Sequence, residues 1–275
     1  MKQYEKTGQK TGYLETPYQI FCLKDYNQKV FEPHYHDFHK ILIFIDGNAS
    51  YFIEGKNYIL NPFDIVLVSA GDIHRPVIHD ASCYERIILY LSKSFFESKD
   101  YQILVNCFSA GSRIIHTDER KNPLLMESML YLQKTKNNED IYSSLHNQVH
   151  IIDFLIHLNQ HVLQLPEMID NAFISNPKIL DIISYINEHI TEDISIDNIA
   201  SALYINRSYM MHLFKSETGY SIMKYIERKR LYTANSLISS GISKTEACYK
   251  CGFKNYSAYY HANRKYNQST DFLPG

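Results

Sequence analysis

Hydrophobic and polar residues form three successive patterns along the chain. From about residue 18 to residue 115, apolar residues alternate with polar ones or form short blocks, as at 40–45 and 65–68. Turn-forming residues end these blocks at 46–48 and 54–57, where Gly and Asn favour tight hairpins. Short strands separated by turns every 8–12 residues or so predict an antiparallel barrel or sandwich.

The spacing of apolar residues becomes helical between about residues 122 and 165. One apolar side is expected to pack on the strands. The other side either meets a second subunit or is internal core as well, because a helix must bury each of its apolar sides. The residues at helical spacing are Ile141, Leu145, Val149, Ile152, Ile156 and Leu163, and those that widen the apolar surface are Ile151, Phe154, Leu155 and Leu158.

Prolines bound a connector at 166–177, since proline cannot continue a helix. The pattern beyond it is helical. A short helix is predicted at 196–203, and Asn206 is a suitable N-cap for a second helix at 207–218. Gly219 suits the C-cap of that second helix. This arrangement is a helix-turn-helix, whose second helix can enter the major groove of DNA.

A second helix-turn-helix is predicted after a longer helix at 222–239. Ser243 caps a helix that runs to Cys251, a Gly-Phe turn follows, and Asn255 caps a final helix at 256–267. Cys251 and Cys248 invite a zinc or redox interpretation. A structural zinc site needs four ligands and no second pair lies nearby, which favours core packing for both cysteines.

The carboxyl-terminal region resembles the AraC/XylS family of transcription regulators over about residues 179–272. The resemblance rests on "ISIDNIASALYINRSYMMHLFKSETGYSIMKYIERKRLYTANSLI" followed by "GISKTEACYKCGFKNYSAYYHANRKY", in which "LFKSETGYS" and "CGFKNYSAYY" are the most specific parts. It implies that the second helix of each unit enters one of two adjacent major-groove segments, about one helical turn (~34 Å) apart.

The resemblance also implies which residues contact DNA. The candidates for reading bases are Arg207, Ser208, Met211 and His212 in the first unit and Tyr256, Ser257, Tyr260 and His261 in the second. Phosphate contacts are expected from Lys215, Lys254 and Arg264, which position the protein without reading sequence. Each of these residues is otherwise a solvated helix-face residue, and Tyr256 and Tyr260 are alternatively part of the core.

The final helix departs from the family pattern. Asn263 and Asn267 stand where the family usually has phenylalanine, Gln268 replaces a usual glycine and Asp271 a usual proline. Buried polar groups without partners are costly. We therefore expect a weaker second unit, with the first unit dominating DNA affinity.

Histidines mark the amino-terminal strands. The segment 32–76 resembles a cupin barrel, the usual sensor domain of sugar-responsive AraC-type regulators, through "HYHDFHKILIFIDG" and "NPFDIVLVSAGDIHRP". Residues of a His-x-His pair share one side of a strand. The effector-binding candidates are His34, His36, Lys40, His74 and Arg75, and the tyrosines Tyr35, Tyr51 and Tyr90 suit a polar, hydroxylated ligand.

A metal site is the alternative use of His34, His36 and His74. Catalytic cupins place a glutamate where this sequence has Lys40, and Phe63 replaces a common turn glycine. A cation at that position opposes binding of a divalent metal. The expectation is therefore no metal, no cofactor and no enzymatic activity, with a metal-dependent cupin enzyme carrying a DNA-binding appendage as the alternative.

Charge and composition agree with a regulator. The net charge is −2, yet residues 175–275 hold 12 Lys and Arg against 9 Asp and Glu, and the preceding residues hold 16 against 21. Five scattered cysteines suit a reducing compartment. With no membrane-length apolar run and no signal-peptide pattern, a cytoplasmic location is expected.

These patterns together predict an α+β protein with two domains. A cupin-like antiparallel β-barrel with a helical dimerisation segment precedes an all-α double helix-turn-helix. The expected boundaries are 1–121 for the barrel, 122–165 for the helical segment, 166–177 for the linker and 178–275 for the DNA-binding domain, with its units at about 194–219 and 242–267.

The predicted function is a sequence-specific transcription regulator, more specifically an activator that responds to a sugar or related metabolite bound in the barrel. Double-stranded DNA, a small-molecule effector and a second copy of the chain are the expected partners, together with a contact to RNA polymerase and none to a membrane. A regulator controlled by protein contact or by thiol oxidation is a further alternative.

Overall fold

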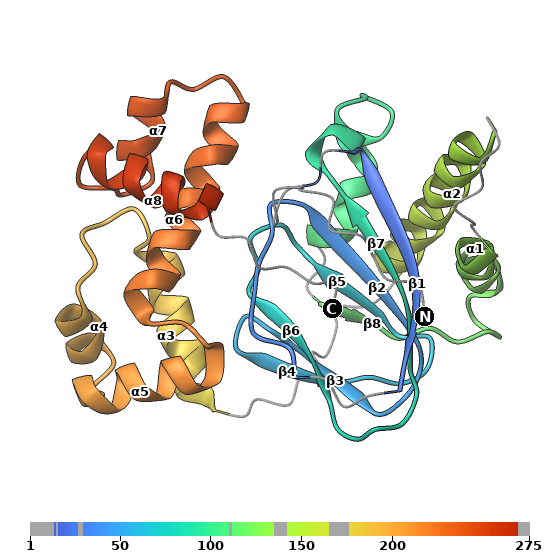
Figure 1. Cartoon of the computed structure of the whole chain (residues 1–275), viewed down its shortest axis with the longest axis horizontal. Helices are drawn as coiled ribbons and strands as arrows, with labels where there is room; N and C mark the ends of the chain where they lie inside the picture. The colour runs from blue at the N-terminus through green and yellow to red at the C-terminus, as the bar shows by residue number, and fades with distance from the viewer. Residues whose placement is uncertain are drawn as a thin grey trace. The chain divides into compact units, whose positions relative to one another are not determined.

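The computed structural model describes residues 14, 16–26, 30–109, 112–134, 142–164 and 176–268. They form two compact units (Figure 1). All strands and helices α1 and α2 make up the strand unit, and helices α3 to α8 make up the helical unit. Most of the expected linker, residues 166–175, lies outside the described residues.

The strand unit contains two sheets in which every strand pairing is antiparallel. Five strands are ordered β1-β7-β2-β5-β8 and three are ordered β4-β3-β6. Their bounds are β1 Tyr18–Asp25, β2 His39–Asp46, β3 Ala49–Ile53, β4 Lys56–Ile59, β5 Ile65–Val68, β6 His74–Ile78, β7 Tyr84–Leu91 and β8 Ile114–Ile115.

Alternation along β2 shows how the two sheets pack. Ile41 and Ile43 join the core that lies under the helices, whereas Leu42 and Phe44 join a second, inner core. Residues of both sheets, such as Tyr51 of β3, contribute to that inner core. The sheets therefore pack face to face, and the expected barrel or sandwich is present as two antiparallel sheets around an apolar interior.

Helices α1 (Pro123–Lys134) and α2 (Ser143–Gln164) cover the outer face of the five-stranded sheet, together with the short 3-10 helices η1 (Lys93–Phe96) and η2 (Gln102–Ser109). Phe154 and Leu158 of α2 are fully buried in the same core as Ile41. This side of α2 packs on the strands, as the helical spacing predicts.

The other side of α2 is open to solvent in the single chain. Leu145 is 58% exposed, Val149 54%, Ile156 40% and Leu163 83%. These four residues are therefore not internal core of one subunit, which removes that alternative for them. Ile141 lies outside the described residues.

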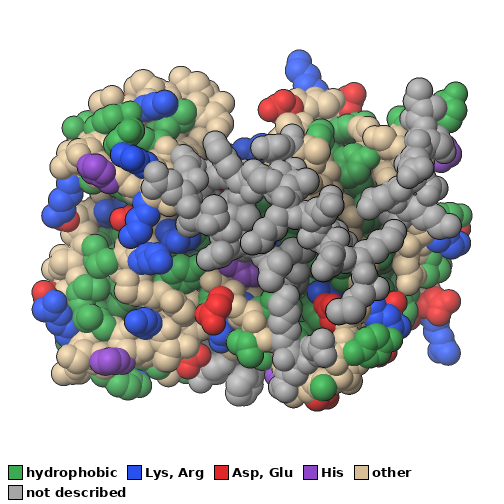
Figure 2. Space-filling view, viewed as in Figure 1, with side chains coloured by type: hydrophobic (Ala, Val, Ile, Leu, Met, Phe, Trp, Pro, Cys, Tyr) green, Lys and Arg blue, Asp and Glu red, His purple; other side chains and the backbone are tan. Residues whose placement is uncertain are grey.

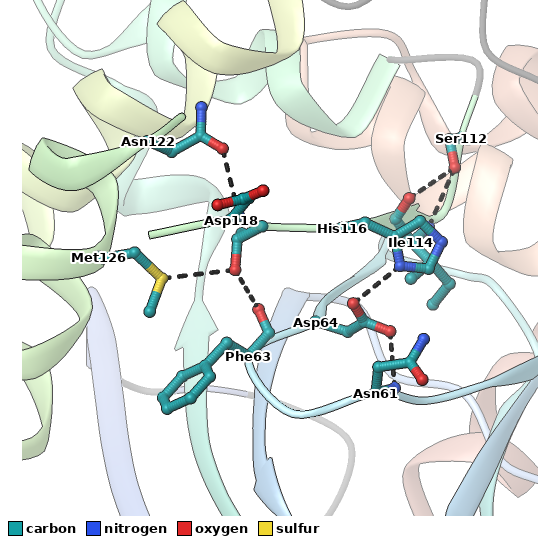
Figure 3. A network of polar contacts seen from close by, with 10 residues as sticks. Asn61, Phe63, Asp64, Ser112, Ile114, His116, Asp118, Asn122 and Met126 are labelled. Atoms are coloured by element: carbon teal, nitrogen blue, oxygen red, sulfur yellow. Dashed lines mark hydrogen bonds and ion pairs between the residues drawn. The ribbon is translucent and has the colours of Figure 1, made fainter. Parts of the chain in front are cut away.

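A polar network fastens the turn before β5 to the chain that leads into α1 (Figure 3). Phe63 adopts a left-handed φ of 69°, a conformation that costs energy for a large side chain. Asp64 accepts a hydrogen bond from the backbone N–H of Asn61 at 2.8 Å and lies 2.8 Å from His116 Nδ1. Thr117 donates to the carbonyl of Phe63 at 2.8 Å. These bonds hold the turn although a glycine is absent.

The helical unit begins with α3 Pro177–Glu188, for which no separate helix was expected, and then has the predicted order of elements: α4 Ile196–Ala202, α5 Arg207–Thr218, α6 Ile222–Ser239, α7 Lys244–Lys250 and α8 Tyr256–Gln268. Asn206 and Ser243 accept hydrogen bonds as N-caps, and Gly219 ends α5 in the left-handed conformation. None of the helices in the described part of the chain combines the length and apolar character needed to cross a bilayer.

Candidate DNA-binding and effector-binding sites

Helix α5 separates its core residues cleanly from its polar ones. Met210 and Phe214 are fully buried and fix the helix on its unit. The opposite face is exposed and carries all five residues expected to contact DNA from this helix, namely Arg207, Ser208, Met211, His212 and Lys215.

Helix α8 is arranged in the same way. Tyr259 and Ala262 are buried against α6 and α7. The residues expected to contact DNA are exposed: Lys254, Tyr256, Ser257, Tyr260, His261 and Arg264. Tyr256 is 39% and Tyr260 49% exposed, so each residue is partly covered and partly accessible at the surface. On the side seen in Figure 2, Lys and Arg side chains are spread across the helical unit.

Asn263, which stands where the family usually has phenylalanine, has a hydrogen-bond partner. Asn263 is half-buried, and its Oδ1 lies 3.5 Å from Nδ2 of Asn235 on α6. The hydroxyl of Tyr259 donates to Oδ1 of Asn235 at 3.0 Å. A polar link between α6 and α8 thus replaces the aromatic contact expected from the family, and Asn263 is not left without a partner. The side chain of Asn267 lies outside the described residues.

Two cations expected to meet DNA are paired with carboxylates of the same unit. Arg207 Nη1 lies 3.1 Å from Asp197, and Lys254 Nζ lies 3.2 Å from Asp193. All four side chains are more than half exposed. DNA phosphates would therefore compete with carboxylates for these two cations.

Arg230 of α6 binds the loop between α3 and α4. Its Nε donates to the carbonyl of Ile190 at 2.8 Å, and its guanidinium also bonds the carbonyl of Glu192. A Cβ on Gly252, in the turn of the second unit, would lie 2.8 Å from the same Ile190 carbonyl oxygen. The loop between α3 and α4 is therefore clamped between α6 and the second turn. The run Arg228–Arg230 gave no sign of this role.

Cys248 and Cys251 are buried in a core shared with Leu231 and Phe253. Burial raises the pKa of Cys251 to about 11, so its thiol stays protonated at neutral pH. No group of three or more His, Cys, Asp or Glu side chains suited to a metal occurs among the described residues. Both cysteines serve as small core residues in this unit.

Three effector candidates come together inside the strand unit with two tyrosines. The rings of His36 and His74 have centroids 4.8 Å apart. Lys40 Nζ lies 5.8 Å from the ring centroid of Tyr51 and 5.9 Å from that of Tyr90. Burial, and secondarily the charge of Arg86, lowers the pKa of Lys40 to about 7.

The other two effector candidates lie elsewhere. Arg75 alternates with the inward His74 on β6 and lies 5.7 Å from the ring of Phe52. His34 Nδ1 is 2.9 Å from the carbonyl oxygen of Glu32, and both residues fall in the same compact unit as helices α3 to α8.

Tyr84 and Arg86 join this interior, although the sequence pattern did not single them out. Arg86 is 2% exposed, and its guanidinium carbon stacks 4.2 Å from the ring centroid of Tyr84. A charged residue in the middle of a strand usually marks the solvent side. The apolar residues that follow it, 87–89, do not reveal which way Arg86 points.

Comparison with known proteins identifies the kinds of domain that the chain contains. Residues 17–132 match the model of the AraC-like ligand binding domain, and residues 199–270 match that of a helix-turn-helix domain. The HTH-type transcriptional activator RhaS of Shigella sonnei is 24% identical over 233 residues, which cover 82% of this chain and 81% of that protein. RhaS of Enterobacter sp. is 20% identical over 229 residues, with 82% of this chain and 81% of that protein covered.

Among solved structures, ToxT of Vibrio cholerae is 16% identical to this chain, with a TM-score of 0.38. The match covers 90% of this chain and 93% of the ToxT chain. A ligand-binding domain joined to a helix-turn-helix domain defines a class of DNA-binding transcription regulators. Within that class, the chain belongs to the AraC/XylS family, as its sequence motifs predict. This is a family of regulators and not of enzymes.

Proposed function

We propose that the chain activates transcription at promoters that it binds through α5 and α8, under control of a small-molecule effector held between the two sheets. The observation that supports this best is the pair of exposed polar helix faces, each placed by a buried core and joined through the common helix α6. The match to transcriptional activators supports the direction of control.

The residues divide by role on the two recognition helices. Arg207, Ser208, Met211 and His212 read bases from the first major-groove segment, and Tyr256, Ser257, Tyr260 and His261 read the second. Lys215, Lys254 and Arg264 neutralise phosphates and set the register of the protein on the duplex.

The effector lies in the interior lined by His36, Lys40 and His74. A binding site between two sheets provides an apolar surrounding with a few polar groups, which is the usual composition of small-molecule sites. Its occupancy changes transcription only if the effector binds the active and inactive states with different affinity.

A second copy of the chain covers the exposed side of α2. Leu145, Val149, Ile156 and Leu163 place apolar surface in water at helical spacing, which marks an interaction face. The dimer acts in the cytoplasm, where bound DNA brings it to RNA polymerase.

Genome-wide mapping of bound DNA, followed by footprinting, tests the proposal. Protection of two adjacent major-groove segments, loss of that protection in Arg207→Ala, and reduced expression of neighbouring genes in a deletion strain are expected. Binding without sequence preference would contradict the recognition helices as assigned. Raised expression on deletion would show a repressor.

In α8 a 3.5 Å amide contact of Asn263 stands where the family usually has a core phenylalanine, so less apolar surface is buried, and the first unit is expected to dominate affinity. His212→Ala should therefore weaken operator binding more than His261→Ala, by roughly 1 kcal/mol or more. Gel-shift titrations on one operator compare the two. Equal losses would contradict the unequal contribution of the units.

A further inference from the structure

The interior between the sheets is polar at one group of positions. Lys40 of β2 and Tyr84, Arg86 and Tyr90 of β7 share the side of their strands that carries the inner core. Lys40 pairs across the sheet with Tyr90, and Tyr51 of β3 faces them from the second sheet. Lys40 is 0% and Arg86 2% exposed. Two cationic side chains are therefore buried on the same side of the five-stranded sheet, Lys40 opposite Tyr90 and Arg86 opposite Phe44.

Some polar atoms in this region have no hydrogen-bond partner among the described residues. They are the hydroxyls of Tyr51 and Tyr84 and the Nε of Arg86. Each such atom costs roughly 1–3 kcal/mol when buried. Buried polar groups of this kind indicate water or a ligand. Because Nε of Arg86 only donates and hydroxyls readily donate, they suit a molecule rich in acceptor oxygens.

The charges in the region narrow the class of that molecule. Arg86 bonds Asp25 at 2.5 Å through Nη1, whereas its buried Nε has no hydrogen-bond partner among the described residues. The charge of Arg86 acts against protonation of Lys40. An anion beside Lys40 would offset the desolvation of its charged form and the repulsion from Arg86, whereas a neutral sugar would offer only dipoles.

We propose that the effector is a small organic acid whose carboxylate lies against Lys40 and whose remaining oxygens accept hydrogen bonds from Nε of Arg86 and the hydroxyls of Tyr51 and Tyr84. The inference rests on the proposed function, which places the effector between the sheets. The other titratable groups of the region are Tyr90 of β7, His74 of β6 and His36, which lies in the segment before β2.

Proton linkage gives this inference a specific signature. Lys40 has a pKa of about 7 in the unliganded protein, so at pH 8 most molecules carry it neutral. A carboxylate beside it raises that pKa, and binding at pH 8 therefore takes up a proton. At pH 6 the side chain is already mostly charged, so uptake nearly vanishes.

Isothermal titration calorimetry on the full-length protein can measure this. The probes are matched pairs of an acid and its neutral counterpart: glucuronate and glucose, galacturonate and galactose, 4-hydroxybenzoate and 4-hydroxybenzyl alcohol, and decanoate and decanol. Titrations at pH 8 in phosphate and in Tris separate proton uptake from binding heat. At least one acid should bind tenfold or more tightly than its partner, with uptake approaching one proton.

Variants identify the groups. Lys40→Met should abolish proton uptake and weaken acid binding at least tenfold, and Tyr51→Phe should weaken binding while uptake remains. Lys24→Met is the matched control, because Lys24 is exposed and pairs with Glu85. Thermal unfolding of each variant shows whether it folds. If Lys40→Met does not fold, Tyr51→Phe still tests the inference.

The outcomes separate this inference from the proposed function. If a neutral compound binds as tightly as its acid and Lys40→Met does not change that binding, the effector is not an organic acid. The chain would still be a regulator controlled by an effector. Binding by no acid of the panel would also overturn the inference. Failure of the proposed function would appear in a different readout, as the absence of specific operator protection by the unliganded and liganded protein.

Discussion

Gly252 shows how one residue without a side chain allows the turn of the second helix-turn-helix unit to pack against the loop between α3 and α4. Its φ of +80° lies in the left-handed region, and a Cβ would meet backbone atoms of Ile190 and Thr191 at 2.8–2.9 Å. Backbone atoms cannot swing away as a flexible side chain does. Both the conformation and the close approach therefore require glycine.

Gly252→Ala should destabilise the helical unit by about 2–3 kcal/mol, since backbone strain and a steric clash add. Gly241→Ala is a matched control, with a φ of +97° and no atom within 4 Å of its Cβ. Urea unfolding of both variants measures the difference. Similar losses of unfolding free energy would show that strain alone acts at Gly252.

Asp193 is a negatively charged residue that is expected to oppose DNA binding. It holds Lys254 at 3.2 Å in the free protein. Asp193→Asn should raise affinity for DNA of any sequence roughly twofold to tenfold at low salt, because the lysine is released and a negative charge is removed. Fluorescence anisotropy measures this, with Glu188→Gln as the control. Unchanged affinity would show that the ion pair does not compete with phosphate.

At the level of elements, the sequence predicts what depends on local chemistry. The N-caps at Asn206 and Ser243 and the left-handed Gly219 are all as expected. The strand alternation that separates Ile41 from Leu42 is readable as well. Contacts between distant residues are not. Nothing near Asn263 in sequence reveals Asn235, and no local pattern shows that Arg86 points inward.

The exposed apolar side of α2 is the expected homodimer interface. Val149→Glu would place a charge in an apolar interface and should raise the dimer dissociation constant at least tenfold. Sedimentation velocity measures it, and Met223→Glu, at an exposed residue of α6, is the control. A variant that dimerises like the unaltered protein would contradict α2 as the interface.

At the level of the whole molecule, an acidic net charge coexists with DNA binding because the two parts of the chain differ in charge. Residues 175–275 carry the excess of Lys and Arg despite the overall −2. Affinity for DNA should therefore depend on the few cations placed at the recognition helices. Removal of any one of them should change how steeply the affinity falls with salt concentration.

Lys215→Gln should reduce the slope of log affinity against log salt by about 1, while sequence preference stays the same, because a phosphate contact carries no base information. Operator and unrelated DNA, titrated from 50 to 200 mM or so of salt, provide the comparison. A loss confined to the operator would instead assign Lys215 to base reading.

The contacts of Arg230 and Gly252 with the loop after α3 predict that the distance between the two DNA segments bound by the protein is fixed. With the loop after α3 held by Arg230 and seated against Gly252, the recognition helices present a fixed step to the duplex. Inserting one base pair shifts the second contact segment by about 3.4 Å and rotates it around the helix axis. The two half-elements of a genuine operator should thus tolerate base changes between them far better than a change in their separation.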